Sequence, residues 1–126
     1  FFANLPAQGM TGLFQDLTDF AGFTEVAPLL ARGSAVADYD NDGDLDVAIS
    51  SIGGRLILLR NDQASGHWLT VQLDGFHPGA VVTAVLPDGH ELLCEIHAGS
   101  GYLSSEDPRC HFGLGAADRV SALRVR

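Results

Sequence analysis

Lysine is missing from the sequence, and basic residues of any kind are scarce. The 126 residues carry seven basic side chains, all arginine, against sixteen acidic ones, which gives a formal net charge of −9. A chain this acidic repels the phosphates of nucleic acids and the headgroups of anionic membranes. We therefore expect no nucleic-acid partner, and general electrostatic binding to anionic membranes is disfavoured.

Long apolar runs are also missing. No stretch approaches the ~20 consecutive apolar residues of a membrane-spanning helix, and no basic segment followed by an apolar one marks a signal peptide. We expect no direct membrane insertion by this chain. The sequence begins with Phe1 rather than Met, and we expect it to be a processed product or the C-terminal part of a longer protein.

A long helical pattern is the third absence, and short apolar runs and alternating patterns take its place. Apolar residues make up 46% of the chain, enough for a modest core, and they fall mostly in short segments between turns. Only residues 12–23 also fit a helical spacing of three. Residues 1–10 and 27–33 are predicted to be irregular. The pattern predicts an all-β chain with strands at residues 14–18, 34–37, 47–51, 55–60, 67–73, 80–86, 91–97, 110–115 and 119–126.

The most informative stretch is Asp38-Tyr39-Asp40-Asn41-Asp42-Gly43-Asp44-Leu45-Asp46. Aspartates occupy every second position, with a glycine between the third and the fourth. Two like charges about 4 Å apart repel by roughly 4 kcal/mol at an effective dielectric near 20. A fold that gathers such carboxylates therefore needs a cation, or it must raise some of their pKa values. Oxygen ligands at alternate positions suit calcium, which accepts about six to eight oxygens.

The stretch does not fit an EF-hand. An EF-hand needs a bidentate Glu at its twelfth position, which is Ile49 here, and both flanks are predicted to be strands rather than helices. A loop that closes its coordination at the ninth position fits better. A solvated acidic turn without metal is the alternative. The predicted metal ligands are the side chains of Asp38, Asp40, Asp42 and Asp46 and the backbone carbonyl of Asp44.

Two parts of the chain resemble known families. Residues 33–61, from Gly-Ser-Ala-Val-Ala-Asp-Tyr-Asp-Asn-Asp-Gly-Asp-Leu-Asp-Val to Leu-Leu-Arg-Asn, resemble an FG-GAP/VCBS-type repeat, and residues 12–22 resemble the segment that links one such repeat to the next. The rest of the chain is similar to an ASPIC/UnbV-type domain. The motifs that carry this second similarity are His67 to Val71, Gly99 to Ser105, Asp107 to Arg109 and His111 to Gly115.

The resemblance implies an architecture. FG-GAP/VCBS-type repeats form calcium-binding blades of β-propellers, and the ASPIC/UnbV domain follows them in cartilage-acidic-protein-like secreted proteins. We therefore expect an N-terminal segment or linker at residues 1–11, a calcium-loop repeat at 12–62 and a small β-sandwich or barrel-like domain at 63–126. The repeat would be one propeller-blade-like antiparallel meander. The chain departs from the family in having one repeat, a shortened segment at 74–79 and an early end at Arg126.

Other chemistry-bearing side chains are predicted to be structural. Positions matching Cys94 and Cys110 are not usually cysteine in the resembled family, so their joint presence hints at a disulfide, with two buried thiols as the alternative. The five histidines show no paired ligand spacing and are expected to be exposed or hydrogen-bonded. The Gly-x-Ser-x-Gly pattern of a hydrolase is absent, so Ser100, Ser104 and Ser105 are not predicted nucleophiles. We expect no catalytic or cofactor-binding residues and no enzyme.

The expected function is that of a calcium-stabilised extracellular interaction or scaffolding module. Unpaired strand edges of a single blade favour docking on protein partners or on remaining propeller blades. We expect the protein to be extracellular, at the cell surface or periplasmic. We expect it to act as an accessory subunit or fragment of a larger assembly. The alternatives are carbohydrate or matrix binding, with Trp68 and Tyr102 as stacking candidates, and a non-catalytic appendage of a secreted hydrolase.

Overall fold

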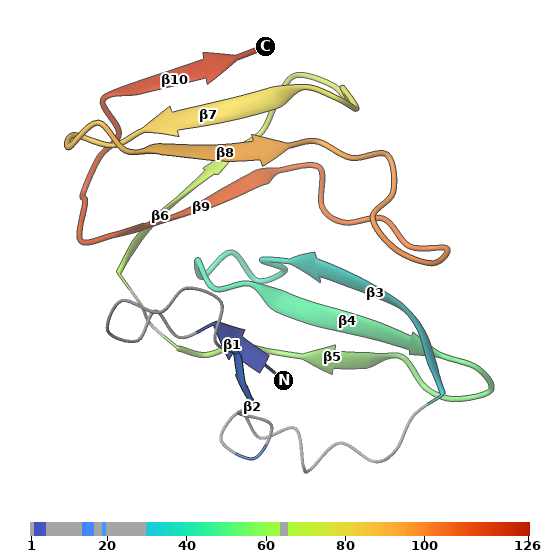
Figure 1. The fold of residues 1–126 in the computed structure, drawn as a ribbon. Helices are drawn as coiled ribbons and strands as arrows, with labels where there is room; N and C mark the ends of the chain where they lie inside the picture. Colours follow the sequence, from blue (N-terminus) through green and yellow to red (C-terminus); the bar gives the residue numbers. More distant parts are fainter. Residues whose placement is uncertain (1, 5–13, 17–18, 20–29, 64–65) are drawn as a thin grey trace.

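The computed structural model describes residues 2–4, 14–16, 19, 30–63 and 66–126 (Figure 1). These residues form antiparallel sheets and contain no helix, so the predicted all-β fold class is confirmed. No helix in this part of the chain has the length and apolar character needed to cross a membrane. The strands are β1 (Phe2–Asn4), β2 (Phe14–Asp16), β3 (Ala31–Ala37), β4 (Asp46–Ser51), β5 (Ile57–Leu59), β6 (His67–Val71), β7 (Val81–Val85), β8 (Glu91–Glu95), β9 (Cys110–Gly115) and β10 (Ala122–Val125).

Strands β3, β4 and β5 form a three-stranded antiparallel meander, as predicted for the repeat. The aspartate-rich stretch connects β3 to β4, and Gly53-Gly54 lies in the turn that follows β4. The prediction of a loop through residue 33 is wrong at its end, because β3 already begins at Ala31. A register shift between Ala31 and Gly33 lets this irregular sequence pair with β4, and a β-bulge of this kind is invisible to a period-two pattern.

The N-terminal strands β1 and β2 pair with each other. The prediction that residues 1–10 are irregular is wrong at 2–4, because a three-residue strand is too short to show a periodicity. The strand predicted at 14–18 is present at 14–16, which excludes the helical alternative there. The rest of the predicted strand, at 17–18, lies outside the described residues, as do residues 27–29 of the loop predicted at 27–33.

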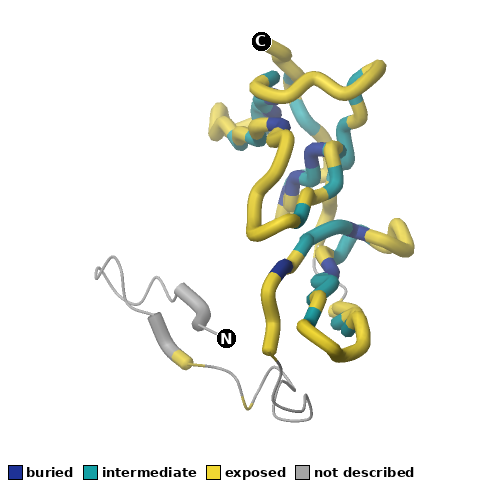
Figure 2. The backbone as a smooth tube through the Cα atoms, turned by 90° about the vertical axis from the view of Figure 1, so that its right-hand side faces the viewer, coloured by how far each residue is buried: buried dark blue, intermediate teal, exposed yellow. Residues whose placement is uncertain are grey.

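The C-terminal part holds the hydrophobic core between two sheets, one ordered β10–β7–β8 and the other β6–β9 (Figure 1). The hairpin predicted over 80–97 is formed by β7 and β8. A disulfide links Cys94 of β8 to Cys110 of β9 and so connects the two sheets, which decides between the two alternatives left open by the sequence. Much of the dark-blue, buried backbone in Figure 2 belongs to this core. Its buried members are Val82, Ala84, Ile96, Cys110, Phe112 and Leu114.

The β6–β9 sheet has a second face. Because strand residues alternate between faces, Cys110 and Phe112 point into the core, and His111 between them points away from it. Opposite His111 lies Thr70, and Trp68 precedes it by two residues on the same side of β6. This outer face is turned toward the connection between β3 and β4 (Figure 1).

Candidate metal centre

The aspartate loop, residues 38–46, leaves β3 and enters β4 through the pair Ala37↔Asp46. Two of its residues have left-handed backbone conformations, Asn41 with φ of 62° and Gly43 with φ of 97°. Asparagine and glycine are the residues that adopt positive φ most readily. The sequence therefore supplies suitable residues at the two positions where the chain reverses tightly.

Two buried carboxylates hold the loop together from within. Asp38 is 5% exposed and Asp46 is 2% exposed. The carboxylate of Asp38 accepts the N–H groups of Asp42 and Gly43, each at 3.1 Å. That of Asp46 accepts the N–H group of Tyr39 in the loop at 3.1 Å and that of Asn61, after β5, at 2.8 Å. These bonds satisfy buried charges that would otherwise be costly to desolvate.

Three of the predicted ligands come together. One carboxylate oxygen from each of Asp38, Asp40 and Asp42 lies within 4.8 Å of the other two. Oxygens that coordinate one calcium ion at about 2.3–2.6 Å lie no more than about 5 Å apart, so these three fit around a single ion. The donor set contains only oxygen, which suits a hard cation such as calcium. The residues present therefore fit the predicted ion.

Asp44 and Asp46 lie outside this group of three. The backbone N–H of Asp44 donates to the carboxylate of Asp42 at 2.9 Å, which turns the loop toward β4. Each oxygen of Asp46 accepts one N–H group, and a carboxylate oxygen retains a further lone pair after one such bond. In this structure Asp46 connects the loop to its flanking residues through hydrogen bonds. The carboxylate oxygens of Asp38, Asp40 and Asp42 lie close together.

The electrostatics of the loop favour a cation. Desolvation and the charges of Asp42 and Asp46 raise the pKa of Asp40 above its ordinary value of 3.8. Desolvation and the charges of Asp42, Asp38 and Asp46 raise the pKa of Asp44 in the same direction. A raised carboxyl pKa means that the ionised form is disfavoured in the fold. A bound divalent ion would reverse this penalty.

Arg109 contacts the loop from the C-terminal part of the chain. Its Nη1 donates to the side-chain oxygen of Asn41 at 2.7 Å, and its Nη2 donates to the backbone oxygen of Asp38 at 2.8 Å. Its Nε donates to Asp107 at 2.7 Å, which orients the guanidinium group. Burial acts to raise the pKa of Asp107, but the hydrogen bonds and charge of Arg109 outweigh it, and the pKa lies below its ordinary value.

The outer face of the β6–β9 sheet makes a second contact with the loop. Nε2 of His111 lies 2.8 Å from the backbone oxygen of Gly43, and since a carbonyl only accepts, this nitrogen carries the proton. The indole of Trp68 stacks on the His111 ring, with centroids 6.1 Å apart. A Cβ added to Gly43 would overlap that indole. Glycine at position 43 thus permits both the turn and the close approach of the sheet.

These contacts were not predicted from the sequence. All three residues belong to the family motifs named above. Trp68 was also a stacking candidate, and His111 was one of the histidines expected to be exposed or hydrogen-bonded. One signal was present: His111 is a polar residue between Cys110 and Phe112 in a predicted strand, so it had to point away from the core. The expectation for histidines is confirmed at His111, which is hydrogen-bonded.

The other predicted side chains are dispersed. Nε2 of His77 lies 2.7 Å from the backbone oxygen of Asp74, while His67, His90 and His97 are exposed. A cavity of about 170 Å³ lies beside Arg109, between the loop and the outer face of the β6–β9 sheet. It is smaller than the clefts of about 300–1,000 Å³ that hold drug-sized ligands. The geometry of this region therefore points to the acidic loop as the candidate binding site.

Comparison with known proteins places the chain in a family. The family model described as "ASPIC and UnbV" matches residues 53–126. Cartilage acidic protein 1 of Mus musculus and that of Xenopus tropicalis are each 37% identical over 101 residues, and that of Homo sapiens is 36% identical over the same length. The alignments cover 74% of this chain but only 15–16% of each relative, so the chain spans about one sixth of their length. Because the family model matches more than half of its residues, the chain belongs to the ASPIC and UnbV family.

Proposed function

We propose that this chain is a calcium-stabilised, non-enzymatic interaction module of an extracellular protein. The observation that carries the proposal is the convergence of oxygens from Asp38, Asp40 and Asp42 within 4.8 Å. In this proposal the ion neutralises the acidic loop and fixes the turn between β3 and β4. Asp46 would complete the coordination through its side chain and Asp44 through its backbone carbonyl.

The blade itself is the proposed interaction element. We propose that residues 12–62 are an FG-GAP/VCBS-type repeat and that residues 63–126 are the ASPIC/UnbV domain. Strand β5 pairs only with β4 among the described strands. Leu56, just before this strand, is 71% exposed, and Leu58 within it is 47% exposed. An unpaired edge flanked by apolar side chains favours the addition of another strand, either from a protein partner or from further repeats of a propeller.

The extracellular location is supported by two features. The disulfide between Cys94 and Cys110 is of the kind that persists in oxidising compartments. Related segments occur in proteins named cartilage acidic protein 1. Calcium modules outside the cell bind their ion with dissociation constants of about 0.1–1 mM, and we propose an affinity in this range or tighter.

A thermal-denaturation experiment tests the calcium proposal. At about 10 mM free calcium, an affinity of this size stabilises the fold by about 1.4–2.7 kcal/mol. The melting temperature should therefore rise by several degrees with calcium and fall to the metal-free value with a chelator. The Asp42→Ala variant should lose this dependence, because it removes one of the three converging carboxylates.

The matched control is Asp74→Ala, which removes an exposed carboxylate in a different turn. This variant should keep the full calcium response. A melting temperature of the unsubstituted chain that ignores both calcium and chelator would overturn the proposed calcium site. An equal response of Asp42→Ala and Asp74→Ala would overturn the assignment of the ion to the aspartate loop.

Carbohydrate binding is a second candidate, and it is favoured by one surface hollow. Tyr102 is 66% exposed and lines a hollow of about 510 Å³ together with Arg32, Ser50 and Ser51. An aromatic ring beside polar side chains is the arrangement that a sugar would require. Trp68 is less suited to stacking on a sugar, because its indole already stacks on His111 and lies against Gly43. Loss of binding to an immobilised glycan on Tyr102→Ala, with retention on Trp68→Phe, would support this alternative.

A further inference from the structure

Three of the four motifs that carry the ASPIC/UnbV resemblance, those containing Trp68, Arg109 and His111, reach the aspartate loop. Trp68 belongs to β6, His111 belongs to β9, and Asp107 and Arg109 immediately precede β9. The hydrogen bonds from Arg109 and His111 to the loop join residues 68 to 71 positions apart in the sequence. The loop thus has its shape set by two different parts of the chain, its own blade and the following domain.

The contacts lie at the places where the loop turns. Arg109 holds the side chain of Asn41, whose φ is 62°. His111 holds the carbonyl of Gly43, whose φ is 97°. Between these positions lies Asp42, one of the three residues whose carboxylates converge. Arg109 also donates a hydrogen bond to the backbone oxygen of Asp38, which is another of these three residues. The contacts therefore brace the backbone that carries the converging oxygens.

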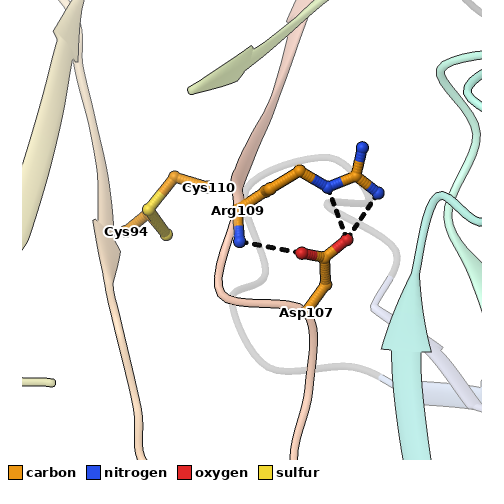
Figure 3. Close-up of a disulfide and its surroundings, with 4 residues drawn as sticks. All are labelled: Cys94, Asp107, Arg109 and Cys110. Atoms are coloured by element: carbon orange, nitrogen blue, oxygen red, sulfur yellow. Dashed lines mark hydrogen bonds and ion pairs between the residues drawn. A yellow bond between two sulfur atoms is a disulfide. The ribbon is translucent and has the colours of Figure 1, made fainter. Parts of the chain in front are cut away.

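The direction of the Arg109 side chain follows from its neighbours. Figure 3 shows the Cys94–Cys110 disulfide and the Arg109 side chain on opposite sides of the same short segment. The disulfide holds this segment to β8, and Asp107 fixes the guanidinium through Nε and through an ion pair with Nη2. Nη1 and the shared Nη2 of the rigid fork contact the loop at the same time, an arrangement that a single lysine ammonium does not reproduce.

We propose that Arg109, supported by His111 and Trp68, is a positioning residue for the metal site of the aspartate loop. The ASPIC/UnbV sheet then sets the calcium affinity of the loop that precedes it. This inference rests on the proposed calcium function. When only the braced conformation binds well, the apparent dissociation constant equals the intrinsic one divided by the populated fraction of that conformation. By reciprocity, calcium tightens the contact between loop and sheet.

Simple electrostatics predicts the opposite sign, which makes the inference testable. Arg109 carries a positive charge close to the proposed cation site, so removing that charge alone should strengthen calcium binding. If Arg109 instead acts by positioning, its removal should weaken binding. We expect Arg109→Gln to raise the calcium dissociation constant about tenfold, within the range of typical couplings between sites.

The experiment measures calcium affinity by isothermal titration calorimetry on the 126-residue chain. Arg124→Gln is the matched control, because Arg124 is an exposed arginine on β10 that pairs with Glu91, and its removal changes the net charge equally. Arg109→Lys retains the charge without the fork and should bind with intermediate affinity. Asn41→Gly removes one acceptor of Arg109 without straining the positive φ, and its effect should not add to that of Arg109→Gln.

Trp68 supplies a second measurement, since it is the single tryptophan of the chain and lies against Gly43. Calcium should change its emission in the unsubstituted chain, and the midpoint should move to higher calcium in Arg109→Gln. Should this variant fail to fold, His111→Phe, which removes only the bond to Gly43, tests the same brace.

The outcomes separate this inference from the proposed function. No calcium binding by the unsubstituted chain overturns both. Normal binding by the unsubstituted chain with equal or tighter binding by Arg109→Gln, or by His111→Phe where the first variant does not fold, overturns the positioning role and leaves the calcium site intact.

Discussion

Asp40 is an exposed carboxylate whose pKa the fold raises, because desolvation and its neighbours Asp42 and Asp46 oppose its charge. A carboxyl group with a raised folded pKa destabilises the metal-free fold as the pH rises above 3.8, and the effect is complete above the folded pKa. At neutral pH the ionised carboxylate of Asp40 is therefore repelled by Asp42 and Asp46 in the metal-free loop. Its negative charge stabilises the fold only when a cation is bound.

This opposition predicts a change of sign for Asp40→Asn. In chelator at pH 7, the variant should be as stable as the unsubstituted chain or more stable, because it removes a repelled charge. In about 10 mM calcium it should be less stable, because a ligand charge is lost. Thermal denaturation under both conditions checks the prediction. Destabilisation of equal size in both would show that Asp40 serves the fold and not the ion.

Asp107 has the opposite electrostatic situation. Burial acts to raise its pKa, but Arg109 outweighs burial, so the folded pKa lies below 3.8. The ion pair therefore contributes its full stability above pH 3.8, and the contribution is lost as the pH falls through the lower folded value. Asp107→Asn should cost about 1.5–3 kcal/mol at pH 6, the usual value of hydrogen bonds to charged groups.

The pH dependence distinguishes this ion pair from simple packing. Denaturant unfolding at several pH values should show a constant gap between Asp107→Asn and the unsubstituted chain above pH 5, closing below pH 3.8. Arg124 and Glu91 form an exposed pair on a different sheet, and Glu91→Gln serves as the control with an effect of about 0–1 kcal/mol. A gap that persists unchanged at low pH would contradict the assignment.

At the scale of elements, the contact between the aspartate loop and the β6–β9 sheet depends on Gly43. Gly43→Ala places a methyl group where the Trp68 indole lies, in addition to the strain of a φ of 97°. Gly53 is a suitable comparison, since its φ is 66° and an added Cβ there meets nothing within 4 Å. Strain alone costs roughly 1–2 kcal/mol, and overpacking adds about 1–3 kcal/mol.

We therefore predict that Gly43→Ala loses more stability than Gly53→Ala, by about 1–3 kcal/mol. Trp68 emission should change in Gly43→Ala and remain unchanged in Gly53→Ala, because only the former displaces the indole. Denaturant unfolding followed by this fluorescence measures both quantities. Equal losses in the two variants would show that the sheet does not press on the loop.

The elements also show how far sequence reasoning reaches. Alternation and turn residues predicted β3 to β10 within a few residues, because each pattern is local. The spacing of the aspartates predicted four side-chain ligands, of which Asp38, Asp40 and Asp42 converge, whereas Asp46 accepts backbone N–H groups. The contact of Arg109 with the loop could not be predicted, since a strand pattern shows which face points outward but not what packs on it. The start of β3 was not predicted either, because the register shift between Ala31 and Gly33 interrupts the two-residue period on which strand prediction relies.

At the scale of the whole molecule, a chain with a small core contains a disulfide and a proposed calcium site. The buried apolar residues, among those described, all lie in the two C-terminal sheets or directly after β8. The disulfide joins these sheets and closes a segment with a sequence separation of 16. A covalent loop of this size restricts the unfolded chain and contributes about 3 kcal/mol in the chain-entropy picture. The proposed calcium ion would act on the other side of the equilibrium, because it would bind the folded loop.

Because the disulfide acts on the unfolded state and the ion on the folded one, their effects should add. We predict that Cys94→Ser with Cys110→Ser lowers the free energy of unfolding by about 3 kcal/mol and leaves the calcium-dependent increment unchanged within about 0.5 kcal/mol. Denaturant unfolding of both chains, each with calcium and with chelator, gives the four values required. If calcium stabilises only the disulfide-bonded chain, the bond is also needed to hold Arg109 against the loop. Additive values would instead mean that pairing of β9 with β6 is enough to place Arg109.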